Sequence, residues 1–168
     1  MADSSPAIAN EFIRRGLAGE QPFTQMQLQR LVYIANGWNL AINGSPLTVD
    51  SPEALHYGPV YDLLRVALIR YGTRPVTREI RFCDFSSDDS ELEVVAKLDK
   101  IEMPVIERVF KVYGRFHSYQ LSALTIQNNA PWADVYNGGA GEYRQIPSEM
   151  IRQQFIDIVH KKHDEKAA

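Results

Sequence analysis

The chain has 168 residues, 45% of them hydrophobic and 23% charged, and a net charge of −3, which is typical of a globular domain with one core. The near-neutral charge makes a nucleic-acid partner an unfavoured expectation, and no apolar run approaches the ~20 residues that span a bilayer. The single cysteine, Cys83, and the lack of a signal peptide favour the cytoplasm. We therefore expect one domain over residues 1–168, with its core at about 8–160 and frayed ends at 1–5 and 161–168.

The first predicted helix is short and amphipathic. Ser5 followed by Pro6 is typical of an N-cap and a first-turn proline. Apolar residues then recur at helical spacing until Gly16 or Gly19, where we expect the helix to end.

The second predicted helix, at about residues 24–43, is the central element of the chain. Thr24 and Gln27 form a capping-box pattern at its start, and Gly44 with Pro46 forms a stop pattern at its end. Apolar residues cover most of its circumference, so other elements must pack on both faces. The main members of these apolar faces are Leu28, Leu31, Tyr33 and Trp38.

Short extended pieces are expected at residues 47–49 and 54–57, followed by another helix. Gly58 and Pro59 would open this helix, with the proline in its first turn, and Gly72 would end it. Alternating apolar residues around a polar loop then predict a β-hairpin at about residues 76–98.

The last third of the chain predicts three more helices. One begins near Pro104 and ends at Gly114, a short one begins at Ser118, and the last follows Ser148. Residues 128–141 are expected to form a loop that contains Trp132. The fold class is therefore mainly α with a small antiparallel β element, in which helices pack around a central buried helix.

Candidate reactive groups do not form a recognisable site. His160, His163 and Asp164 share one turn of the last helix, but a solvated basic helix end explains them better than a metal site does. His56 and His117 lack the context of a paired nucleophile and base. We expect no catalytic residue, no metal and no cofactor.

Two surfaces remain open to a binding role. Tyr57, Gly58, Pro59, Val60 and Tyr61 make a compact turn, and Trp132 is a second aromatic anchor; such residues serve in protein interfaces and in cores alike. Three arginines could contact phosphates, which would make the protein a nucleic-acid-binding regulator, although a solvated face explains them as well. They are Arg65, Arg70 and Arg74.

Three stretches carry a family resemblance: MQLQRLVYIANGWNLAINGSPL at residues 26–47, EALHYGPVYDLL at 53–64 and YGRFHSYQLSALTIQNNAPW at 113–132. Together with a closing helix after Ile146, they resemble the Panacea domain of Soc-type antitoxins and many phage-associated proteins. The chain departs from the family at two points, because Ile126 stands where a histidine is frequent and Arg30 where a lysine is common.

The resemblance implies a binding protein rather than an enzyme. Panacea domains neutralise a cognate toxin by direct contact, and Soc-type antitoxins also deliver the toxin to an ATP-dependent protease. Matched residue by residue, the family signature falls on Leu28, Leu31, Tyr33 and Trp38 of the central helix, on Tyr57–Tyr61 and on Trp132.

Overall fold

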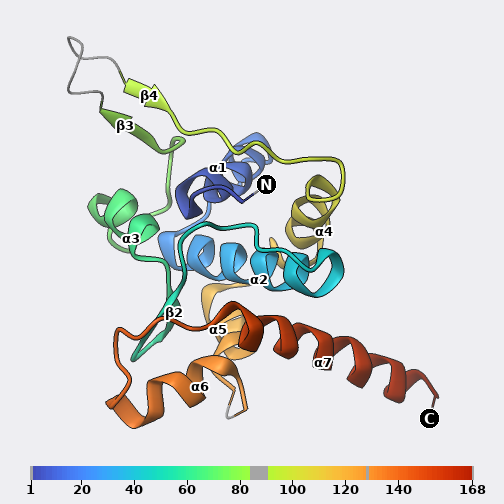
Figure 1. Cartoon of the computed structure of the whole chain (residues 1–168). Coiled ribbons are helices and arrows are strands. Elements are labelled where there is room, and N and C mark those ends of the chain that lie inside the picture. Colours follow the sequence, from blue (N-terminus) through green and yellow to red (C-terminus); the bar gives the residue numbers. More distant parts are fainter. Residues whose placement is uncertain (1, 84–90, 128, 168) are drawn as a thin grey trace.

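The computed structural model describes residues 2–83, 91–127 and 129–167, and Figure 1 shows their arrangement. The fold is mainly α with a small antiparallel β part, as the sequence predicts, but the described residues contain two hairpins where one was expected. The helices are α1 (Ser5–Ala18), α2 (Gln25–Asn43), α3 (Asp62–Leu68), α4 (Met103–Tyr113), α5 (Ser118–Thr125), α6 (Pro131–Tyr136) and α7 (Ser148–Ala167), with 3-10 turns η1 (Ile69–Tyr71) and η2 (Asn137–Gly139). The strands are β1 (Glu53–Leu55), β2 (Gly58–Val60), β3 (Arg81–Cys83) and β4 (Glu91–Glu93).

Helix α2 crosses the middle of the molecule, with α1 above it and α7 below it in Figure 1. The predicted capping box is present, since Thr24 and Gln27 satisfy each other's backbone N–H groups. Gly44 ends the helix in the left-handed conformation, at φ 75°. Helices α1, α3, α4, α5 and α7 all pack against α2, which buries almost its whole surface.

Asp3 and Ser5 are held in place by hydrogen bonds, in contrast to the frayed end expected at residues 1–5. The N-cap is Ser4 rather than Ser5. The Asp50 carboxylate accepts hydrogen bonds from the backbone N–H (2.8 Å) and the hydroxyl (2.6 Å) of the buried Ser5. Asp3 donates a backbone hydrogen bond to the Leu47 carbonyl at 2.9 Å. These bonds satisfy polar groups that would otherwise be buried unpaired.

The prediction that Gly58 and Pro59 open a helix is wrong. Residues Gly58–Val60 form β2, which pairs antiparallel with β1, and α3 begins only at Asp62. The physical reason is the backbone of Gly58, whose φ of +123° lies far from the right-handed helix. Proline fits an extended edge strand as well as a first helical turn, so the sequence pattern could not separate the two.

The second hairpin is shorter than the range 76–98 predicted for it. Its strands β3 and β4 have three residues each, with Phe82 opposite Leu92, and the residues between them lie outside the described part of the chain. Figure 1 shows the hairpin projecting away from the helices, and the side chains of Phe82 and Leu92 are exposed.

Two predictions for the C-terminal third also change. Trp132 lies on α6 rather than in a loop, because Pro131 starts a short helix. The glycines that follow this helix had led to the prediction of a loop. The tail expected to fray at 161–168 is helical as far as Ala167, although its side chains are exposed.

Candidate functional site

Two adjacent polar side chains of the buried helix α2, Gln29 and Arg30, hold the segment 57–61. The Gln29 amide donates a hydrogen bond to the Tyr61 carbonyl (3.0 Å) and accepts one from the Tyr61 N–H (2.8 Å). This two-point contact imitates the pairing of a neighbouring strand. It fixes the backbone at the point where β2 turns into α3.

The Arg30 guanidinium group is fully buried and donates to three oxygen atoms. Its Nη2 and Nη1 atoms each lie 2.5 Å from a backbone carbonyl, those of Tyr57 and Pro59, and its Nε lies 3.2 Å from the Ser122 hydroxyl on α5. Burial lowers the pKa of Arg30 to about 10, which leaves the group charged at neutral pH. Because a rigid fork is needed to reach two carbonyls at once, lysine could not reproduce this contact.

Gly58 is the residue that allows this close approach. A Cβ atom at this position would lie 2.6 Å from the Nη2 atom of Arg30, and φ at Gly58 is +123°. Any other residue would therefore meet both a steric and a conformational penalty. Residues Gly58, Pro59, Val60 and Tyr61 are buried, and Tyr57 is half-buried.

Two tyrosines from the predicted set lie in the core. The Tyr33 hydroxyl donates to Oε1 of Gln154 on α7 at 2.9 Å, and burial raises the pKa of this tyrosine. The Tyr61 hydroxyl lies close to Thr48 and Asn36 but makes no hydrogen bond of ordinary geometry to either, and burial raises its pKa as well. Both phenols stay neutral and contribute to packing.

Both tryptophans direct their indole N–H groups to partners within the domain. Trp132 donates to the Leu55 carbonyl at 2.6 Å, and its ring stacks on Tyr136 with centroids 5.0 Å apart. Trp38 donates to the Tyr113 hydroxyl at 3.2 Å, with the Phe155 ring against its edge. Helix α6 thus supports β1, the strand that precedes the buried segment.

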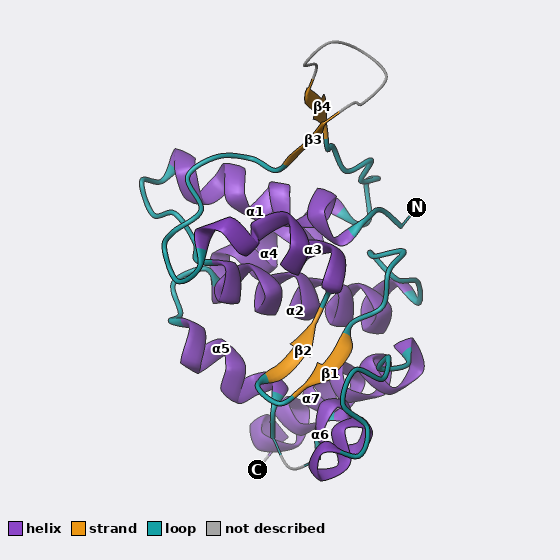
Figure 2. Cartoon of the chain, turned by 90° about the vertical axis from the view of Figure 1, so that its left-hand side faces the viewer, coloured by secondary structure: helices purple, strands orange, loops and turns teal. Residues whose placement is uncertain are grey.

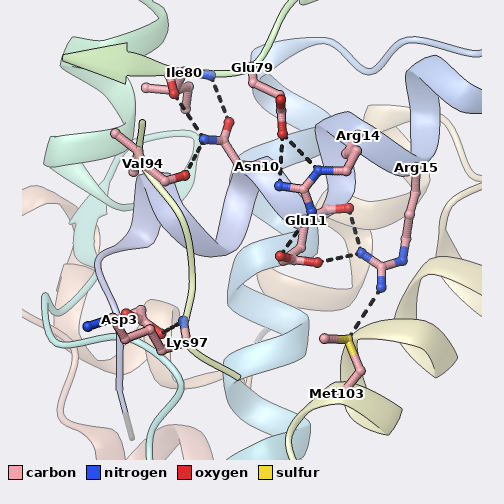
Figure 3. A network of polar contacts seen from close by, with 10 residues as sticks. All are labelled: Asp3, Asn10, Glu11, Arg14, Arg15, Glu79, Ile80, Val94, Lys97 and Met103. Atoms are coloured by element: carbon pink, nitrogen blue, oxygen red, sulfur yellow. Dashed lines mark hydrogen bonds and ion pairs between the residues drawn. The ribbon is translucent and has the colours of Figure 1, made fainter. Parts of the chain in front are cut away.

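A polar network on α1 anchors the base of the projecting hairpin (Figure 3). The Asn10 side chain donates to the carbonyls of Ile80 (3.0 Å) and Val94 (2.8 Å) and accepts from the Ile80 N–H (2.7 Å). One side chain on α1 therefore ties together the two chain segments that lead into β3 and out of β4.

The same network contains a carboxylate between two arginines. Glu11 accepts from Arg14 (3.1 Å) and Arg15 (2.7 Å), and Arg14 also pairs with Glu79 at 2.8 Å. Burial alone would raise the pKa of Glu11, but the hydrogen bonds and charges of the two arginines outweigh it and lower this pKa.

The histidines considered for catalysis or metal binding lie apart. His56 is exposed and lies 3.8 Å from Glu142. His117 directly precedes α5 and stacks on Tyr119 of that helix. His160 and His163 lie on the exposed end of α7. Among the residues that the structure describes, no group of three or more His, Cys, Asp or Glu side chains could hold a metal ion. No helix in the described ranges is long and apolar enough to cross a membrane.

The sequence prediction named the segment 57–61, but it gave Gln29 no role and named Arg30 only as a departure from the family. These two residues hold that segment in place. A signal was available, since two polar residues stand between Leu28 and Leu31 on a helix with little solvent-facing surface. Such residues must find partners in the core.

The domain is built around one buried helix, and comparison with known proteins gives its family. The family described as "Antitoxin SocA-like, Panacea domain" matches residues 28–133, which extend from near the start of α2 to near the start of α6. The chain belongs to this family.

One relative is Antitoxin SocA of Caulobacter vibrioides (strain NA1000 / CB15N). It is 29% identical over 152 residues, which cover 89% of this chain and 80% of that protein. No solved structure matches the chain.

Proposed function

We propose that this chain is an antitoxin that neutralises a cognate bacterial toxin by binding it directly, without catalysing a reaction. The observation that carries this proposal is the similarity to Antitoxin SocA over 89% of the chain. The match extends well beyond residues 28–133, so the whole domain is compared rather than one motif.

The packing of the domain supports a binding role. Gln29, Arg30 and Asn10 hold segments outside the helices in fixed positions through hydrogen bonds from rigid helices. A surface that is ordered before binding loses less conformational entropy on association, which favours affinity.

We assign a structural role to the aromatic turn. Gly58, Pro59, Val60 and Tyr61 expose little surface to a partner, and their backbone groups bond to α2. Trp132 is only partly exposed and its N–H group is bonded to Leu55. These residues would shape the scaffold, and the toxin would contact the outer faces of the helices.

Co-expression tests the proposal. A small toxin encoded beside the gene for this chain is induced either alone or together with the chain. We expect the chain to restore growth and to co-purify with the toxin. Persistent growth arrest despite a soluble, folded chain would rule the proposal out.

A proteolytic-adaptor role is a separate part of the proposal. If the chain also delivers the toxin to an ATP-dependent protease, the half-life of the toxin should fall when the chain is present and recover when the protease is deleted. An unchanged half-life together with restored growth would leave simple sequestration.

A further inference from the structure

The outward face of α3 and η1 carries three large aliphatic side chains. Leu63, Val66 and Ile69 recur every third residue and are 51%, 58% and 62% exposed, whereas Leu64 and Leu68 on the other face are buried. Helix α3 lies on the left of Figure 1 and so faces the viewer in Figure 2. Aliphatic side chains gathered on one face of a short helix indicate an interaction surface.

The residue that follows the apolar stripe in the chain, Arg70, lines a depression together with two further arginines. The depression lies around Tyr71, directly after Ile69, and is lined by Pro22, Arg70, Tyr71, Arg74, Pro75, Thr77 and Arg78. Arg78 is paired with Glu91 at 3.1 Å. None of the lining residues carries a carboxylate, so the depression has a positive charge.

Two of these arginines are held in position by neutral groups. The Arg70 guanidinium lies 5.1 Å from the centre of the Tyr71 ring. Arg74 donates from Nη2 to the Arg70 carbonyl (2.9 Å) and from Nε to the Tyr71 carbonyl (3.3 Å). Neither arginine forms an ion pair with a described residue, unlike Arg65, which pairs with Asp62 at 2.7 Å. Their charges are therefore available to a partner.

We propose that α3 and η1, with Arg70 and Arg74, form the docking surface for an acidic amphipathic segment of the protein partner. Apolar side chains of that segment cover Leu63, Val66 and Ile69, and its carboxylates pair with the two guanidinium groups. The inference rests on the proposed function and names the surface and the chemistry of toxin recognition.

The mixture of chemistries favours a protein over a nucleic acid. Arginines alone would suit phosphates, but the adjacent aliphatic stripe offers a phosphate backbone no partner. Arginines beside apolar anchors are typical of the residues that dominate protein interfaces. The stripe would be the centre of an interface, whose total buried area must reach roughly 1,200–2,000 Å² for a stable complex.

Two double variants and two matched controls test the surface. Val66→Gln with Ile69→Gln removes apolar anchors, and Arg70→Glu with Arg74→Glu reverses the free charges. Ile42→Gln is the apolar control, because Ile42 is 65% exposed at the far end of α2. Arg108→Glu is the charge control on the exposed side of α4. Urea unfolding midpoints equal to wild type confirm that each variant folds.

Binding is measured by calorimetry against the purified toxin encoded beside the gene. We expect each double variant to weaken binding by at least about tenfold, the factor expected when a central contact is lost, and each control to change it less than about twofold. Raising the salt concentration should weaken binding of wild type but not of the Arg70→Glu, Arg74→Glu variant.

Three results would overturn the docking surface. The first is wild-type affinity in both double variants, which refutes this surface and leaves the proposed function intact. The second is DNA binding: wild type binds a 20-base-pair duplex at low salt, whereas the Arg70→Glu, Arg74→Glu variant does not bind the duplex but still binds the toxin. The third is a wild-type dimer that the Val66→Gln, Ile69→Gln variant converts to a monomer, since a second copy would then cover the stripe. If wild type does not bind the toxin at all, both the proposed function and this inference fail.

Discussion

Replacing Arg30 by methionine tests the buried contact that organises the domain. Methionine approximates the volume of the arginine stem but cannot donate a hydrogen bond. The carbonyl groups of Tyr57 and Pro59 would lose their partner, and the Ser122 hydroxyl on α5 would lose its bond to Nε.

The expected cost follows from these three bonds. A hydrogen bond to a charged group contributes roughly 1.5–3 kcal/mol, and a buried carbonyl left unpaired costs about 1–3 kcal/mol. Removal of the charge offsets part of this loss, because the burial of Arg30 is itself unfavourable. We expect the free energy of unfolding to fall by roughly 2–4 kcal/mol, which corresponds to roughly 5–15 °C in Tm for a domain of this size.

Urea unfolding followed by circular dichroism measures this change. Arg65→Met is the matched control, because Arg65 makes only an exposed pair with Asp62, and its replacement should change the free energy of unfolding by less than about 0.5 kcal/mol. Equal stability of the Arg30→Met and Arg65→Met proteins would show that the carbonyl groups find other partners at no cost, and that Arg30 does not stabilise the segment 57–61.

Three further predictions concern the same contacts. Gly58→Ala should lower the free energy of unfolding by at least about 2 kcal/mol, because φ at Gly58 is positive and Arg30 lies against it; in the Arg30→Met background the cost should fall by roughly 1 kcal/mol. Trp132→Phe should cost about 1 kcal/mol, because the bond to the Leu55 carbonyl is lost while the ring stack remains. Glu11→Gln should lower the free energy of unfolding at neutral pH and have less effect in acid. The folded-state pKa of Glu11 is lowered, so its contribution is present above the unfolded value of about 4.5 and is lost as the pH falls through the lower folded value.

Each of these has an outcome that contradicts it. A Gly58→Ala cost that is the same with and without Arg30 would show that the guanidinium does not crowd this site. Unchanged stability of Trp132→Phe would mean that its indole N–H is equally well solvated in the unfolded chain. A stability difference between wild type and Glu11→Gln that does not shrink as the pH is lowered below about 4.5 would exclude the carboxylate as its source.

Signals that act over a few residues predicted α2 correctly. Thr24 and Gln27 are three residues apart and Gly44 directly follows the helix, so the sequence contains both members of each contact. The same holds for α4, which has Pro104 in its first turn and Gly114 after its last.

Contacts between distant residues were not predictable in this way. The conformation of Gly58 depends on Arg30, which precedes it by most of a helix and a loop. Apolar periodicity also ignores polar residues, so Gln29 and Asn10 received no role although each holds a segment far along the chain. Their burial could be known only after α2 and α1 were placed in the core.

The apolar stripe on α3 shows the opposite difficulty. In sequence, helical spacing places Leu64 on the buried face of this helix, and the structure agrees. Only the placement of the helix shows how much of Leu63, Val66 and Ile69 is exposed. The recognition surface proposed above therefore follows from the structure, whereas the family follows from the sequence.

Direct titration of the purified toxin into the purified chain tests whether the chain acts by binding alone. We expect a saturable complex of fixed stoichiometry, formed without any nucleotide, metal or protease, together with loss of the toxin's activity at the same molar ratio. Inactivation of the toxin by catalytic amounts of the chain, with no complex detected, would contradict it.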